Sequence, residues 1–300
     1  MAHHGSARPE WAALEVVHEL ASAEVALVSP EKDWNVVAAT RFLLRNIDVT
    51  LPALGVPAFG VNYGADMQLE RTLHGKKVSG CGIAGHLSIL PPDADTRWVF
   101  DKPGDIVLVL LNRQLFDQAI EESTDRDAKS VDVLPQFVIR DLVLERVAHQ
   151  LLKEISEPGP GSRLSTDTLA QELAAHLIDT HSNLDHRKGN RSLTIAPTKL
   201  KRAEEFIVSN LAIEVSLHDI ANAAGMSLFH FAKAFKQATG QSPYQYVKEQ
   251  RLRHARALLH GSMSIGEVAK AVGFSHSYFT ALFARRMGMT PSKFRDVLHS

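Results

Sequence analysis

The chain has 300 residues, of which 45% are hydrophobic and 22% are charged, and this composition is that of an ordinary soluble protein. At roughly 100 to 200 residues per domain, the length predicts two domains. No run of about eighteen apolar residues is present and no secretory pattern opens the chain, so the cytoplasm is the expected location. The single cysteine, Cys81, excludes an internal disulfide framework and a cysteine zinc site.

Charge is divided unevenly along the chain. From Ala196 to Ser300 there are 14 Lys and Arg residues against 7 Asp and Glu, whereas the first 195 residues carry 19 against 27. A basic domain collects phosphates electrostatically, and an acidic domain of this size has no reason to touch nucleic acid. On charge alone, the basic half is also compatible with a solvated surface.

In chain order, the first predicted elements are β-strands. Between Pro57 and Leu111, short alternating or apolar runs are separated by turn residues, which indicates antiparallel β structure. The runs are FGVNY, MQLERTL, LSIL, RWVF and IVLVLL. We expect them to belong to a β-barrel of about residues 25–112, either up-and-down or jelly-roll, but the pattern assigns no strand before Pro57.

Two amphipathic helices follow, at about 136–155 and 164–182, separated by the breaker run EPGPGS. With the strands they give a first domain of residues 7–182. The preceding run MAHHGS resembles the remnant of an affinity tag, and no expectation is based on it. Polar and turn residues dominate 183–196, which predicts a linker to a second domain of residues 197–298.

The second domain contains an internal repeat. At an offset of 48 residues, SLHDIANAAGMS from Ser216 aligns without a gap with SIGEVAKAVGFS from Ser264. In each copy, apolar residues at helical spacing predict a short helix. The serine is placed to cap its start, and Gly225 or Gly273 follows its last apolar residue, where a left-handed conformation ends a helix at low cost.

A second helix is predicted after the turn in each copy, capped by Ser227 or Ser275. The residues expected on its inward, core-forming face are Phe231, Phe235, Phe279, Leu282 and Phe283. Helix, glycine turn and helix make a helix-turn-helix unit, expected at about 216–240 and again at 264–288. One such hairpin is compatible with mere packing, but two copies at one period in the basic half favour DNA binding.

Three further helices complete this expected all-α domain. One runs from Lys199 to Leu211, a spacer helix covers PYQYVKEQRLRHARALLHG between the copies, and a short helix follows Pro291. On the spacer, Arg251, Arg253 and Arg256 are either solvated charges or phosphate contacts. The predicted fold class is therefore α+β: an N-terminal β-barrel with two packing helices, then an all-α C-terminal domain of two helix-turn-helix units joined by a spacer helix.

Three segments of the second domain carry a family resemblance. They are IANAAGMSLFHFAKAFKQATGQSPYQYV, RLRHARALL and IGEVAKAVGFSHSYFTALFARRMGMTPSKFR. From Pro197 to Leu298 the chain thus resembles the AraC/XylS family of transcription regulators. The resemblance implies that both second helices enter successive major grooves on one face of double-stranded DNA, about 34 Å apart. It also implies a small-molecule effector, a homodimer and contact with RNA polymerase.

In such units the first turn and outer face of the second helix meet base edges. In the first unit the candidate DNA-binding residues are Ser227, Leu228, Phe229, His230, Ala232, Lys233 and Lys236. In the second unit they are Ser275, His276, Ser277, Tyr278, Thr280, Arg285 and Arg286.

The two sets of candidates are not equivalent. Ala281, the counterpart of Lys233, stands where many family members carry arginine. The segment 273–283 is also one residue shorter than the usual second unit, which predicts a differently turned outer face. We therefore expect the first unit to supply most base discrimination, and the second to hold phosphates through Arg285 and Arg286.

The amino-terminal half has a resemblance of its own, because LSILPPDADTRWVF looks like the cupin-type sensor domain of many family members. Candidate effector-binding residues are Tyr63, His74, Arg97 and Trp98, since small-ligand sites combine an aromatic lining with a few polar groups. Core packing explains each of them nearly as well. An apolar stripe of Leu142, Val143, Val147 and Leu151 suits a dimer interface, and burial against the chain's own barrel explains it equally.

The alternative function is a cupin-like metal-dependent enzyme with a helical appendage. However, His74, His86, Asp66 and Glu70 lack the cupin spacing of two close histidines followed by a carboxylate. No metal, cofactor or catalytic residue is therefore expected, and an enzyme gives no reason for the repeat. A regulator without an effector, controlled by a protein partner, is a further alternative.

Overall fold

The computed structural model describes residues 9–20, 24–30, 34–124, 126–159, 161–184 and 194–299. The chain divides into two compact units, each of which combines two stretches of sequence. The first is Met1–Glu157 with Leu169–Arg191, and the second is Pro158–Thr168 with Ser192–Ser300. The expected boundary is therefore incomplete, because residues 158–168 precede the predicted linker and yet belong to the second unit. Most of that linker, 185–193, lies outside the described residues.

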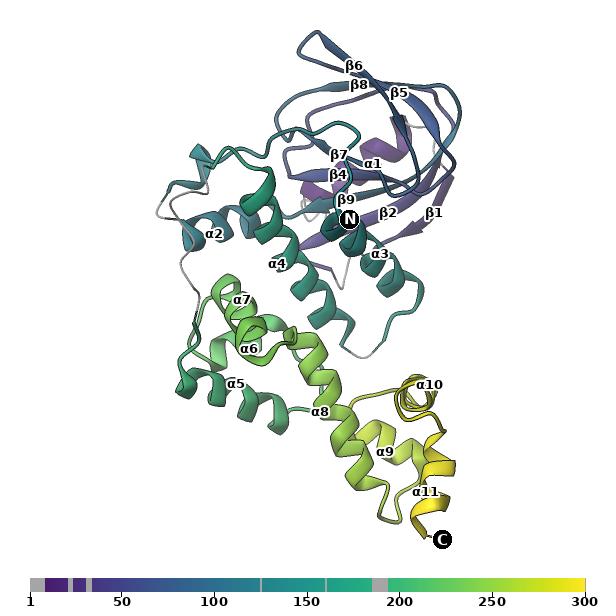
Figure 1. Ribbon diagram of the computed structural model, residues 1–300, viewed down its shortest axis with the longest axis vertical. Coiled ribbons are helices and arrows are strands. Elements are labelled where there is room, and N and C mark those ends of the chain that lie inside the picture. Colours follow the sequence, from purple (N-terminus) through teal and green to yellow (C-terminus); the bar gives the residue numbers. More distant parts are fainter. Residues whose placement is uncertain are drawn as a thin grey trace, which may run out of the picture. The chain divides into compact units, whose positions relative to one another are not determined.

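Two antiparallel sheets form the β-rich part of the first unit (Figure 1). The five-stranded sheet has the order β1 (Glu24–Val28), β2 (Val37–Leu44), β9 (Gly104–Leu111), β4 (Ala58–Asn62) and β7 (Leu87–Leu90). The four-stranded sheet has the order β3 (Asp48–Leu51), β8 (Thr96–Phe100), β5 (Met67–Leu73) and β6 (Lys76–Gly82). The five strand runs read from the sequence are confirmed. Strands β1, β2, β3 and β6 were not predicted.

The central strands of the five-stranded sheet supply much of the core of this unit. Strand β9 reads GDIVLVLL and is buried along most of its length, as expected of a strand covered on both faces. Phe59 on β4, Ile89 on β7 and Val109 on β9 are fully buried. Helix α1 (Pro9–Leu20) packs against β2 and β3, and α3 (Leu142–Ser156) packs against β1, β2 and β9.

Helix α3 begins later than the predicted residue 136. Two hydrogen bonds join Leu87 of β7 to Ile139, each with an N to O distance of 2.9 Å, so this stretch continues the sheet. The helix then starts behind Asp141, whose Oδ1 accepts hydrogen bonds from the amides of Val143 at 2.9 Å and Leu144 at 3.0 Å. The other helical segments of this part of the chain are α2 (Arg113–Ser123), the 3-10 turn η1 (Ala128–Ser130) and α4 (Ser162–His181).

Seven helices make up most of the described part of the second unit. They are α5 (Pro197–Ser209), α6 (Leu217–Ala223), α7 (Leu228–Thr239), α8 (Pro243–Leu258), α9 (Ile265–Ala271), α10 (His276–Met287) and α11 (Pro291–His299). Within the described residues, no helix combines the length and hydrophobicity that a membrane crossing requires.

Each helix-turn-helix unit has an apolar core of its own. Helices α5, α6 and α7 enclose the first cluster, which contains Phe231 and Phe235, and α9 and α10 enclose the second, which contains Phe279 and Phe283. These four phenylalanines are fully buried, which confirms their predicted role. The spacer helix α8 serves both, because its first half gives Val247 to the first cluster and its second half gives residues such as Leu252 to the second.

The repeat in the sequence is a repeat in structure. Helices α6 and α7 match α9 and α10 residue for residue at the offset of 48. Ser216 and Ser264 each form a capping box, and the turn glycines Gly225 and Gly273 have φ of 61° and 69°. The two copies therefore have equal element lengths, and the shortening relative to the usual second unit of the family stays a prediction.

Candidate nucleic-acid interface and ligand cavity

The second helix of each unit, α7 or α10, starts differently although its backbone is the same. Ser275 caps α10 as predicted, because its Oγ accepts a hydrogen bond from the amide of Tyr278 at 3.3 Å. Ser227 precedes α7 with nearly the same backbone angles but makes no capping hydrogen bond. Its Oγ is buried and has no hydrogen-bond partner among the described residues. The prediction of a side-chain cap at Ser227 is therefore wrong.

The face of α7 that carries the DNA-binding candidates is only partly open to solvent. Leu228 and Ala232 are half-buried and pack against the first apolar cluster. His230 and Lys233 are also half-buried, whereas Lys236 is exposed. This helix therefore combines anchoring contacts with basic groups that reach the surface.

The corresponding face of α10 is more open. Ser275, His276, Ser277 and Arg285 are all exposed. Thr280 is half-buried, and its hydroxyl donates a hydrogen bond to the carbonyl oxygen of His276 at 2.9 Å. That bond lies within the helix, so the hydroxyl proton already has an acceptor and is not available to donate to a DNA base.

Tyr278 and Arg286 have partners within the second unit. The ring of Tyr278 lies 5.3 Å from that of Phe274, centroid to centroid, and it packs against the second apolar cluster. Its Cε2 atom would lie 3.2 Å from a Cβ placed on Gly159. Arg286 lies 3.9 Å from the carboxylate of Glu249 on α8, and its side chain remains 58% exposed. An exposed pair at that distance contributes little and leaves Arg286 able to approach a phosphate.

A buried arginine on the spacer helix connects the two helix-turn-helix units. Arg251 is 2% exposed, and its guanidinium lies over the ring of Phe274 at 5.4 Å. It donates hydrogen bonds to the carbonyl oxygens of Ile213, at 2.7 Å, and Gly273, at 3.3 Å. Burial lowers the pKa of Arg251, but a guanidinium remains charged over the whole physiological range. For Arg251, both sequence interpretations, a solvated charge and a phosphate contact, are therefore wrong.

The two carbonyls held by Arg251 belong to different copies of the repeat. Ile213 lies just before α6, and Gly273 is the turn glycine between α9 and α10. The chain also comes very close here, because a Cβ on Gly273 would lie 2.7 Å from the carbonyl oxygen of Leu211. The side chain of Arg251 and the close approach of Gly273 to Leu211 thus fix the turn of the second helix-turn-helix unit against the segment that precedes α6 in the first.

The first residues of α4 form part of this second unit. Leu164 is fully buried in the first apolar cluster, and Asp167 accepts a hydrogen bond from the amide of Leu217 at the start of α6. Burial raises the pKa of Asp167 to about 6, and Asp219 adds to the rise, while Arg163, the Leu217 amide and His218 oppose it. No sequence pattern in LSTDTL indicated this contact, because a helix that is predicted as amphipathic can pack against any apolar surface.

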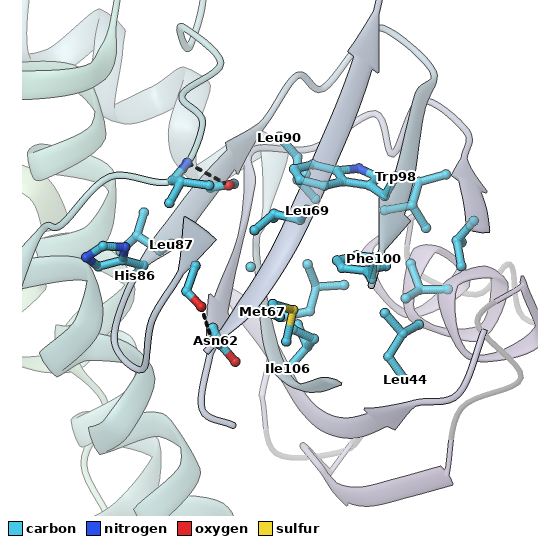
Figure 2. Close-up of a pocket in the computed structure, with 18 of the residues that line it drawn as sticks. Leu44, Asn62, Met67, Leu69, His86, Leu87, Leu90, Trp98, Phe100 and Ile106 are labelled. Atoms are coloured by element: carbon cyan, nitrogen blue, oxygen red, sulfur yellow. Dashed lines mark hydrogen bonds between the residues drawn. The ribbon is translucent and has the colours of Figure 1, made fainter. Parts of the chain in front are cut away.

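The facing sides of the two sheets in the first unit enclose a cavity of about 100 Å³ (Figure 2). This volume holds several water-sized groups. Leu44 and Ile106 line it from one sheet, and Leu69, Trp98 and Phe100 line it from the other. Its walls are almost entirely apolar, which suits a ligand of the same character.

Three polar residues reach the wall of this cavity. The side-chain amide of Asn62 donates to the carbonyl oxygen of Gly82 at 3.0 Å, and Ser88 Oγ accepts from the amide of Val138 at 3.1 Å (dashed lines in Figure 2). His86 lies at the edge of the cavity, away from Trp98 and Phe100. Its Nδ1 is buried and has no hydrogen-bond partner among the described residues. A buried nitrogen without a partner is a candidate contact for a polar group of a ligand.

A second polar group of the first unit consists of one carboxylate and two imidazoles. Asp141 Oδ2 lies 2.7 Å from His176 Nε2 and 2.8 Å from His181 Nε2. Burial alone would raise the pKa of Asp141, but hydrogen bonds from both histidines and from the amide of Leu144 outweigh it and lower the pKa to about 2. This group was not predicted from the sequence, since 35 residues separate the carboxylate from the first histidine.

Comparisons with known proteins agree with the geometry of the second unit. A family described as "Helix-turn-helix domain" matches residues 220–296. The regulatory protein PocR of Salmonella typhimurium is 32% identical over 123 residues, which are 40% of this chain and 41% of PocR. The transcriptional regulator ExsA of Pseudomonas aeruginosa is 37% identical over 99 residues, 32% of this chain and 36% of ExsA.

A solved structure matches the same region. It is a transcriptional regulator of Chromobacterium violaceum, described as an AraC-type DNA-binding domain-containing protein, with 32% identity over 33% of this chain and 91% of that one, and a TM-score of 0.32. The carboxyl-terminal region is an AraC-type helix-turn-helix domain. The chain spans about two fifths of the length of the curated relatives it matches, and they bear the names of regulators rather than of enzymes.

Within the AraC-type domain, several predicted DNA contacts are tied to its own core. Ser227, through its buried Oγ, and Tyr278, through its ring contacts, are less accessible than predicted from the sequence. The side chain of Phe229 lies outside the described residues. The remaining candidates are half-buried or exposed on α7 and α10, and their contact with DNA stays a prediction.

Of the four predicted effector-binding residues, only Trp98 lines the cavity. Arg97 is its neighbour on β8 and points to the opposite face, where its side chain is 52% exposed and pairs with Asp48. His74 lies in the β5–β6 turn with φ of 47°, and Tyr63 lies just beyond β4 with Arg41 5.7 Å from its ring. For these three residues, proximity to turn residues and strand ends in the sequence did not indicate which face they occupy.

The predicted dimer stripe on α3 is divided. Val147 and Leu151 are fully buried inside the first unit, so the alternative explanation, burial against the chain's own strands, is correct for them. Leu142 is 66% exposed and Val143 is half-buried. The metal group weighed in the sequence also does not form, because His74, His86, Asp66 and Glu70 are not among the residues that converge in the described part of the chain.

Proposed function

We propose that this protein is a sequence-specific DNA-binding regulator of transcription. The observation that carries the proposal is the pair of helix-turn-helix units with matching element lengths, joined by one helix and connected through Arg251. Such a pair presents two helices at a fixed separation, and this is what reading two successive major grooves requires. The excess of basic residues after Ala196 supports the same conclusion, because it favours the phosphate backbone.

A salt titration on a selected duplex tests the proposal. Duplexes enriched from a random pool on the full chain are compared with a shuffled duplex of equal length by fluorescence anisotropy. We expect the selected duplex to bind at least about a thousandfold more tightly, with log K falling linearly as log salt rises. Equal affinity for both duplexes, or affinity independent of salt, would contradict the proposal.

We also propose that a small apolar effector in the cavity of the first unit controls DNA binding, and that the two sheets form a cupin-like barrel around it. The apolar walls support this, as does His86 Nδ1, which has no hydrogen-bond partner in the described part of the chain. The effector must bind two states of the protein with different affinity, since otherwise it shifts no equilibrium. A homodimer through Leu142 and Val143, and contact with RNA polymerase at the promoter, remain predictions of this proposal.

Filling the cavity tests whether a ligand binds between the two sheets. A Cβ on Gly60 would meet only Ile106 Cγ2, at 3.8 Å, so Gly60→Val adds volume to the cavity wall without a clash at Cβ. We expect the variant to lose binding of an uncharged fluorescent dye by at least about tenfold while keeping its affinity for the selected duplex. Unchanged dye binding would refute a ligand site between the sheets.

A further inference from the structure

The carboxylate and two imidazoles at Asp141, His176 and His181 are held from several directions. Asp141 Oδ1 is fixed by two amides of α3, which leaves Oδ2 for the histidines. His181 is 7% exposed, and its carbonyl oxygen accepts a hydrogen bond from the amide of Leu134 at 2.7 Å. The three polar atoms lie within 4.8 Å of one another, so they converge on one point.

We propose that these three side chains form a binding site for a divalent transition-metal ion, with zinc as the best fit. Two imidazole nitrogens and one carboxylate oxygen are a ligand set that zinc takes in proteins, with a water molecule or another ligand at the fourth position. Imidazole nitrogens disfavour magnesium and calcium, which prefer oxygen ligands. Cys81, the single cysteine, is not among the residues of the group.

The present distances are close to those that zinc needs. Ligand atoms about 2.0 to 2.1 Å from a tetrahedral ion lie about 3.3 Å apart. The two contacts to Asp141 Oδ2 are 2.7 and 2.8 Å, so each must open by about half an ångström. His176 has room for this, because its side chain is 19% exposed.

A hydrogen-bond network is the competing explanation for the same geometry. If each Nε2 carries a proton, both rings donate to the carboxylate and need no ion. Zinc needs the lone pair of each Nε2, so a neutral ring must first move its single proton to Nδ1, with no net release of protons. The ionised Asp141 then changes from an acceptor of two hydrogen bonds to a ligand, while its other oxygen continues to cap α3.

A metal at this site would join two helices of the first unit. It would tie the start of α3, through Asp141, to the last turns of α4, through the histidines. Because zinc binds this folded arrangement and not a separated chain, it would raise the melting temperature of the protein. The inference is independent of the proposed effector and of DNA binding.

The test is a zinc titration of the full chain after treatment with a chelator. His3, His4 and Cys81 are other possible ligands, so the titration uses both the unmodified chain and one with His3→Gln, His4→Gln and Cys81→Ser. We expect one equivalent of zinc in the substituted chain, with a Tm rise of about 5 °C at a hundredfold excess of free zinc over Kd. Cobalt(II) at the same site should give visible absorption from a low-coordinate ion.

Glutamine variants separate the metal site from the hydrogen-bond network. His176→Gln and His181→Gln each keep an N–H donor for Asp141 but lose the imidazole ligand. We expect each to weaken zinc binding by at least about tenfold, and the control His149→Gln, exposed on α3, to leave it unchanged. If His181→Gln unfolds, His176→Gln decides. Absence of binding in the substituted chain, or glutamine variants that bind like their parent, would overturn the proposal.

Discussion

The two helix-turn-helix units share a backbone but differ in what surrounds them. In the first helix-turn-helix unit, the serine that precedes α7 does not cap the helix with its side chain. Two of the candidate DNA contacts on α7 pack against the apolar core, and Leu164 of α4 belongs to that core. In the second helix-turn-helix unit, Ser275 caps α10, and His276 and Ser277 are exposed. A repeated sequence therefore fixes the elements and their spacing, whereas the surface each copy presents depends on the residues packed around it.

This comparison also shows how the two units are connected. The second unit reaches the first through its turn, where Gly273 approaches Leu211 and accepts a hydrogen bond from Arg251. The turn of the first helix-turn-helix unit differs in its space: Gly225 accepts a hydrogen bond from Lys199 Nζ at 3.0 Å, but no atom of the described residues lies within 4 Å of a Cβ placed on it. An added Cβ is therefore expected to cost more stability at Gly273 than at the equivalent Gly225.

The glycine pair gives the largest expected effect. Gly225→Ala introduces an L residue at φ of 61°, which costs about 1 kcal/mol of strain. Gly273→Ala adds to similar strain a Cβ 2.7 Å from a backbone oxygen, so we expect about 3 to 4 kcal/mol of lost stability. Urea unfolding followed by circular dichroism measures both.

The same pair tests the coupling between the units. We expect Gly273→Ala to weaken binding to the selected duplex far more than Gly225→Ala does. The added Cβ would displace α9 and α10 from the segment around Leu211 that precedes α6. Equal losses of stability and of DNA affinity in the two variants would show that the contact at Leu211 does not set the arrangement.

Asp167, the buried carboxylate that contacts the first helix-turn-helix unit, gives the next largest effect. Asp167 is protonated up to about pH 6 in the folded chain and ionises near 3.8 when exposed, so the folded state binds the extra proton between these values. Stability therefore falls as the pH rises from 4 to 6 and stays reduced above 6. Asp167→Asn keeps an oxygen acceptor for the Leu217 amide and removes the charge.

We expect Asp167→Asn to be more stable than the parent by up to about 3 kcal/mol at pH 8 and nearly equal to it at pH 4. The measurement is the urea midpoint of the parent and the variant at several pH values. A variant that is less stable at pH 8 would mean that the hydrogen bond to α6 outweighs the burial of the charge.

Sequence reasoning worked where local chemistry determines the structure. Serine caps, turn glycines and the spacing of apolar residues placed α6, α7, α9 and α10 within a few residues, and the buried phenylalanines were assigned correctly. Ser227 is the instructive exception. Its position predicts a cap, but the orientation of a hydroxyl also depends on neighbours that the sequence does not place.

The errors concern contacts between distant parts of the chain. Arg251 reads as one of several basic residues on a helix, and only the fold brings the carbonyls of Ile213 and Gly273 to it. Leu164 and Asp167 read as part of a helix of the first domain, although they pack on α6. In the strands, Arg97 and Trp98 were both assigned to a pocket, although neighbours on a strand face opposite sides.

The smallest expected effect concerns which unit reads the bases. Lys233 carries a charge at the surface of α7, whereas the hydroxyl of Thr280 already donates to His276. We expect Lys233→Ala to reduce the preference for the selected duplex over a shuffled one by about 1 to 2 kcal/mol, and Thr280→Ala by less. Anisotropy titrations at one salt concentration provide the comparison. A larger loss of specificity from Thr280→Ala would reverse the ranking of the two units.

We propose that the two helix-turn-helix units, held at a fixed separation, read one duplex together. A hydroxyl-radical footprint of the full chain on the selected duplex tests it most directly. We expect two protected windows on the same face of the duplex for each bound domain, about one helical turn apart, and loss of affinity when either window is scrambled. A single window, or full affinity after the second window is scrambled, would contradict it.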